Sequence, residues 1–135
     1  MRVFADTSYW IAIFDPKDDL HEKALKVAQR LSTAEIVTSE MVLGEFLNSF
    51  ASSGRVLRER VARSVEALRR SQQVTVTSQT PEQFEDALRL YQQGKDKDWS
   101  ITDCASFNIM RDIGISIAIA YDRHFEQAGY KALLR

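Results

Sequence analysis

The chain has 135 residues, the size of one ordinary domain. Hydrophobic residues make up 44% of it and charged residues 27%, a globular composition that argues against a disordered or fibrous chain. The net charge of −1 gives no sign of a nucleic-acid partner, although a nearly neutral total can conceal an acidic pocket surrounded by basic residues.

No targeting or membrane segment is visible in the sequence. The longest apolar runs, such as residues 115–120, fall short of the roughly 20 residues that cross a bilayer. The first six residues lack the features of a secretory signal. Cys104 is the single cysteine, so no internal disulfide can form. We therefore predict a soluble, cytoplasmic protein without a membrane partner, made of one domain over residues 1–135.

The first half of the chain alternates short strands with helices. An apolar strand ends at Asp6-Thr7-Ser8, whose side chains can cap the next helix, and Ser39 can cap the helix after the second strand. The last helix of this half is amphipathic and rich in arginine. In chain order we predict a strand over residues 3–5, helices over 9–14 and 19–31, a strand over 35–38, and helices over 41–50 and 56–70.

The second half continues the alternation. Thr80-Pro81 is a strong helix start, because threonine can cap and proline suits the first helical position. A later helix can be capped by Asp98 or Ser100 and ends at Gly114. The elements here are a strand over Val74–Thr77, helices over 81–91 and 101–112, a strand over 115–120, a short helix over 124–128 and an apolar stretch over 130–134. The whole pattern predicts an α/β domain with a mostly parallel sheet covered on both faces.

Four carboxylates fall where such a sheet binds ligands, outside the carboxyl ends of its strands. Asp6 follows the first strand and Asp122 the fourth. Glu45 and Asp103 lie in helices that are otherwise apolar, where carboxylates are rarely buried without a partner. Few basic residues lie close in sequence, so clustered carboxylates would bind a hard cation such as Mg²⁺ or Mn²⁺. A metal held by carboxylates, in a chain with scattered arginines, indicates phosphodiester hydrolysis.

Each acid also has a structural interpretation. Asp6 and Asp98 can be helix caps, and Asp122 can be a turn residue. Glu45 and Asp103 can be half-exposed helix residues, the latter with a favourable position near a helix start.

Two further residues are interpreted as structural, and the role of one group of arginines stays open. His124 lies in a strand-to-helix turn, where a lone histidine is more often structural than a ligand or base. Cys104 is interpreted as a small core residue. The arginines of the helix over 56–70 can contact RNA or form a solvated face.

Four motifs in this order resemble a PIN domain: Phe4-Ala5-Asp6-Thr7-Ser8, Gly44-Glu45-Phe46, Asp98-Trp99-Ser100-Ile101-Thr102-Asp103-Cys104, and Tyr121-Asp122-Arg123-His124-Phe125 with Gln127-Ala128-Gly129-Tyr130. The resemblance covers essentially the whole chain. It is greatest to small single-domain prokaryotic members, including the VapC-type toxins of toxin–antitoxin pairs. It implies a Rossmann-like three-layer α/β/α fold and an endoribonuclease that depends on Mg²⁺ or Mn²⁺.

The resemblance also implies roles for particular residues. The catalytic and metal-binding quartet corresponds to Asp6, Glu45, Asp103 and Asp122. The supporting positions correspond to Thr7, Ser8, Asp98 and Thr102. Arg123 and Lys97 are expected to hold the RNA backbone. Because VapC-type relatives dimerise and are inhibited by a small antitoxin, the expected partners are RNA, a second copy of the chain and a cognate antitoxin protein.

Other acidic α/β folds fit less well. A receiver domain needs an aspartate at the end of the third strand, where Val74–Thr77 has none. A haloacid-dehalogenase-type phosphatase needs an aspartate at position 8, which is Ser8. Two alternatives remain open: a PIN module that binds RNA or protein without catalysis, and a DNA-directed nuclease of the same superfamily.

Overall fold

One parallel sheet of five strands organises the chain. A computed structural model describes residues 1–135, and the strand order in the sheet is β3-β2-β1-β4-β5. Every neighbouring pair of strands runs parallel, so the predicted mostly parallel sheet is confirmed. The strands are β1 (Arg2–Ala5), β2 (Glu35–Ser39), β3 (Val74–Thr77), β4 (Ile117–Ile119) and β5 (Lys131–Ala132).

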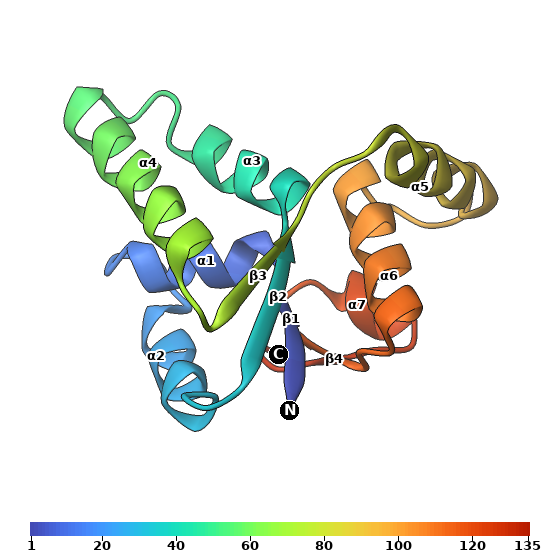
Figure 1. Cartoon of the computed structure of the whole chain (residues 1–135), viewed down its shortest axis with the longest axis horizontal. Helices are drawn as coiled ribbons and strands as arrows, with labels where there is room; N and C mark the ends of the chain where they lie inside the picture. The colour runs from blue at the N-terminus through green and yellow to red at the C-terminus, as the bar shows by residue number, and fades with distance from the viewer.

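Seven helices cover the two faces of this sheet. Figure 1 shows α1 to α4 on one side of it and α5 to α7 on the other, which makes three layers. The helices are α1 (Thr7–Phe14), α2 (His21–Arg30), α3 (Glu40–Ser49), α4 (Arg55–Arg70), α5 (Pro81–Gln93), α6 (Ile101–Ile113) and α7 (Arg123–Gln127). None of them is both long enough and apolar enough to cross a membrane.

The central strand β1 is apolar because both of its faces are covered. Val3, Phe4 and Ala5 are inaccessible to solvent, as expected for a parallel strand between two helical layers. The buried hydroxyl of Thr38, in β2, donates to the carbonyl of Ala5 at 2.9 Å and accepts from the indole N–H of Trp10, in α1, at 3.2 Å. These bonds fix the end of β1 and the start of α1 on either side of position 6.

Hydroxyl side chains cap the N-termini of three helices. Ser39 accepts from the backbone N–H of Val42, and Thr80 accepts from that of Gln83, both at 3.1 Å. Ser100 accepts from the N–H of Asp103 at 3.0 Å, so Ser100 and not Asp98 caps α6. Such caps satisfy amide groups that a helix start would otherwise leave without partners.

Most element boundaries differ from the sequence prediction by one or two residues, and two of these differences have a clear local cause. The strand expected over residues 115–120 is only Ile117–Ile119, because the N–H of Ile115 still donates to the carbonyl of Met110 at the end of α6. The helix expected from residue 19 begins at His21, because the carboxylate of Asp18 accepts from the N–H of Leu20 and forms a turn first.

Candidate active site

The loops after β1 and β4 are held together at the carboxyl edge of the sheet. The backbone N–H of Asp6 donates to the carbonyl of Ile119 at 3.1 Å. The N–H of Tyr121 donates to the hydroxyl of Ser8 at 3.3 Å, although the two residues lie 113 positions apart in sequence. Asp6 and Asp122 therefore follow neighbouring strands and face a common edge.

Asp6 is buried among other carboxylates. Asp6 occupies the N-cap position of α1, as its structural interpretation expected, but its side chain makes no capping hydrogen bond. Burial is the main cause that raises its pKa, to about 8; the backbone N–H of Thr7 partly opposes this shift. The charges of Asp103, Asp122 and Glu45 raise the pKa further. The other three acids predicted from the sequence thus lie close enough to Asp6 for their charges to act on it.

Glu45 reaches this edge from α3, the helix that follows β2. It is partly buried, and its Oε1 accepts a hydrogen bond of 2.6 Å from the hydroxyl of Thr7, in α1. A hydrogen bond to a charged group is among the stronger ones in proteins. Thr7 therefore fixes the carboxylate of Glu45 relative to the helix that begins at Asp6.

Asp103 combines a structural role with a place in the cluster. It is 6% exposed, and its Oδ2 accepts from the backbone N–H of Ser100 at 3.0 Å, which completes a capping box at the start of α6. The same oxygen lies 2.9 Å from Nδ1 of His124. Asp103 therefore lies at a helix start, as its structural interpretation expected, but it is buried and not half-exposed.

His124 belongs to the cluster, although its sequence context favoured a structural role. Ligand atoms of Asp103, Asp122 and His124 all lie within 4.8 Å of one another. Asp122 immediately precedes α7, and His124 lies in its first turn, so one short segment carries both. The Asp-x-His spacing was the signal in the sequence that could have linked His124 to Asp122. The contact of His124 with Asp103, 21 positions earlier, could not be predicted because it depends on the docking of α7 against α6.

No lysine or arginine neutralises the four acids. His124 is the only basic residue that pairs with any of them, whereas Lys97 pairs with Asp96 and Arg135 with Glu126. Carboxylate oxygens in this density, without a cationic side chain, fit the oxygen ligands that Mg²⁺ and Mn²⁺ prefer.

Residues 3–130 match the model of the PIN domain family. The chain belongs to the PIN domain family. The resemblance predicted from the four motifs is confirmed, and so is the three-layer fold that it implied.

Two curated relatives and one solved structure resemble this PIN domain over almost its whole length. The relatives are the 23S rRNA-specific endonucleases VapC20 of two Mycobacterium tuberculosis strains, CDC 1551 / Oshkosh and ATCC 25618 / H37Rv. Each is 32% identical over an alignment of 131 residues, with 95% of this chain and 95% of the relative covered. The solved structure is that of Mycobacterium tuberculosis VapC20, described as a sarcin–ricin loop cleaving toxin. It superposes with a TM-score of 0.83 at 31% identity, with 95% of each chain covered.

Several residues that the resemblance implied as supporting or RNA-binding make no polar contact with the acidic cluster. Asp98, Lys97 and Arg123 are exposed and form no ion pair or side-chain hydrogen bond with the four acids. Thr102 is buried, but its hydroxyl makes no hydrogen bond with the quartet. Cys104 is fully buried, and burial raises the pKa of its thiol to about 11, so its interpretation as a core residue is confirmed.

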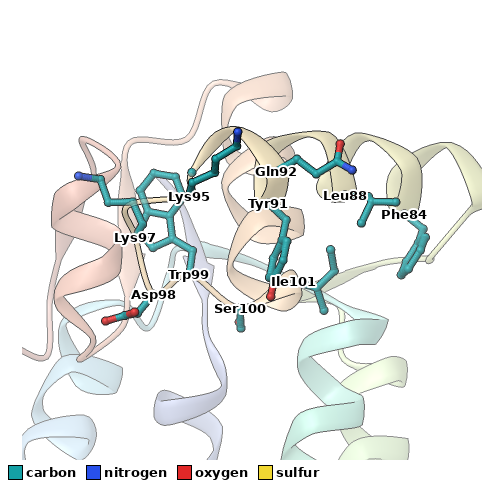
Figure 2. A pocket seen from close by; sticks show the side chains of 11 residues that line it. Phe84, Leu88, Tyr91, Gln92, Lys95, Lys97, Asp98, Trp99, Ser100 and Ile101 are labelled. Carbon is teal, nitrogen blue, oxygen red and sulfur yellow. The ribbon is translucent and has the colours of Figure 1, made fainter.

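A separate groove of about 1030 Å³ lies between α5 and the start of α6. Figure 2 shows Phe84, Leu88 and Tyr91, from α5, lining it together with Trp99, from the loop before α6, and Ile101, the first residue of α6. The three α5 side chains are among the exposed large hydrophobic residues of the chain. The groove contains none of the four clustered acids.

Proposed function

We propose that this PIN domain is an endoribonuclease that requires Mg²⁺ or Mn²⁺. The observation that carries the proposal is the cluster of Asp6, Glu45, Asp103 and Asp122, which has no lysine or arginine partner. Family membership and the 32% identity to an enzyme named as a 23S rRNA-specific endonuclease support RNA as the substrate.

In this proposal the four acids have two kinds of role at this edge of the sheet. Asp6 and Asp103 would bind the cation directly or through water, and Glu45 and Asp122 would complete the site or orient the attacking water. A divalent cation bound there would lower the pKa of that water and stabilise negative charge on the phosphate. Burial of Asp6 favours its protonated form, so this carboxyl must release its proton when it becomes a ligand. Thr7 would keep Glu45 in place during the reaction.

Basic residues around the cluster would hold the RNA backbone. Arg123 follows Asp122 directly and is exposed, and Lys97 lies on the exposed loop before α6. Arginines of α4, among them Arg63 and Arg69, would add further contacts to phosphate groups. Phosphate contacts position a nucleic acid without selecting its sequence, so these residues would set affinity more than target choice.

We further propose that the chain is the toxin of a toxin–antitoxin pair and acts on RNA in the cytoplasm. Its relative VapC20 is described as a toxin, which supports this assignment. The partners would be a cognate antitoxin protein and a second copy of the chain. The exposed apolar side chains of Phe84, Leu88 and Tyr91 support a homodimer that buries this part of α5.

The test is cleavage of a panel of structured and single-stranded RNAs with Mn²⁺, with Mg²⁺ and with EDTA. The panel includes a sarcin–ricin hairpin, because VapC20 is described as cleaving that loop. We expect metal-dependent cleavage by the wild type and none by Asp6→Asn, because asparagine keeps the shape of Asp6 but provides no charge for the cation. Thermal denaturation of the variant in EDTA serves as the folding control.

Each other outcome identifies a different function. RNA binding that is unaffected by EDTA, with no cleavage by any metal, would indicate a non-catalytic PIN module. Metal-dependent cleavage of matched DNA oligonucleotides but not of RNA would indicate a DNA-directed nuclease. An Asp6→Asn protein with full activity would contradict the proposed site.

A further inference from the structure

His124 has a contact that the proposed chemistry does not use. Its Nδ1 lies 2.9 Å from Oδ2 of Asp103, and its side chain is 24% exposed. Oδ2 already accepts a hydrogen bond from the backbone N–H of Ser100, so it is an acceptor toward the ring as well, and Nδ1 carries the hydrogen and donates it to Asp103. The ring therefore acts on Asp103 as a hydrogen-bond donor.

This bond leaves the two oxygens of Asp103 in different states. Oδ2 accepts from both the backbone N–H of Ser100 and the ring of His124, whereas Oδ1 accepts no hydrogen bond from any residue. Two donors on one oxygen fix the rotation of the carboxylate, and they leave the other oxygen free for a cation.

The same bond joins the two segments that carry Asp103 and Asp122. His124 lies two positions after Asp122, so its bond to Asp103 holds the start of α7 against the start of α6. Other contacts keep α7 docked without this bond. The rings of Phe125 and Phe107 pack edge to face at 5.0 Å, and the hydroxyl of Tyr130 donates to the carbonyl of Phe107 at 3.1 Å.

We infer that His124 is a positioning residue, which orients the Asp103 carboxylate so that Oδ1 is presented to the divalent cation beside Asp122. The inference rests on the proposed function, because it assigns His124 a role toward the same metal. Metal affinity then depends on a hydrogen-bond donor at the position of Nδ1 and not on the imidazole ring itself.

The test is the dissociation constant of Mn²⁺, measured by calorimetry or by the electron paramagnetic resonance of free Mn²⁺, with no RNA present. His124→Asn keeps a side-chain N–H donor near the position of Nδ1 but removes the ring. His124→Phe keeps a ring without a donor, and His124→Ala removes both with the least risk to folding. Thermal denaturation in EDTA shows that each variant is folded.

We expect His124→Phe and His124→Ala to weaken Mn²⁺ binding by about 10- to 100-fold, the range found when a residue that orients a metal ligand is removed. We expect His124→Asn to stay within about 3-fold of the wild type, since its donor replaces the missing one. Parental affinity in folded His124→Phe and His124→Ala would overturn the inference and leave the proposed function intact. An equal loss in all three variants would also overturn it, because the ring itself would then be the ligand. A wild type that binds no Mn²⁺ would overturn the inference and the proposed metal dependence together.

Discussion

Asp6 retains a proton that an ordinary aspartate would have lost. Its folded-state pKa is about 8, chiefly because it is buried, against an ordinary value of 3.8. Between these pH values the folded protein binds more protons than the unfolded chain, so the free energy of unfolding decreases as pH rises. We expect the Tm in EDTA to fall between about pH 5 and pH 8 in the wild type, and to fall less in Asp6→Asn, which has no such proton.

Metal reverses this trend, because a cation binds the ionised form of Asp6. The increase in Tm on addition of Mn²⁺ should therefore be greater near pH 8 than near pH 5 in the wild type, and should be absent in Asp6→Asn. If the Tm in EDTA fell equally with pH in both proteins, the proton would belong to another group.

The hydrogen bond from Thr7 to Glu45 is a link between two helices, α1 and α3. Thr7→Val keeps the branched shape but removes the donor. A hydrogen bond to a charged group contributes about 1.5–3 kcal/mol to the stability of the arrangement that it holds. We expect Thr7→Val to cleave RNA at least about tenfold more slowly at saturating metal. Thr7→Ser keeps the hydroxyl and should retain most of the activity. Equal rates for the two variants would show that Glu45 does not need this donor.

Local patterns predicted the helices well because caps and stops are local signals. Thr80-Pro81 and Ser39 mark helix starts through bonds to residues three positions later. The strand β5 was not predicted, because two residues carry no periodicity and only pairing with β4 defines them. The four acids were predicted from strand ends and apolar helices. The role of His124 was not predicted, because its contact with Asp103 depends on how α7 docks against α6.

At the scale of the whole molecule, the apolar part of α5 carries the prediction about assembly. Leu88 is 42% exposed beside Phe84 and Tyr91, and a charge there would oppose burial against a second copy. We expect Leu88→Glu to shift the protein from dimer to monomer in size-exclusion chromatography with light scattering. Leu25→Glu is a matched control, since Leu25 in α2 is 40% exposed and lies outside this surface. A wild type that is monomeric at all concentrations would contradict the proposed dimer.

The strand order also determines when activity can arise during folding. β1 pairs with β2, which follows it closely in the chain, and with β4, which is formed from residues far along the sequence. Closing so long a loop is entropically costly, and contacts of this kind slow folding. Asp122 joins Asp6 only after that closure. We therefore expect that a nascent or partly folded chain, in which β1 and β2 are already paired, has Asp6 and Glu45 in place but does not cleave RNA.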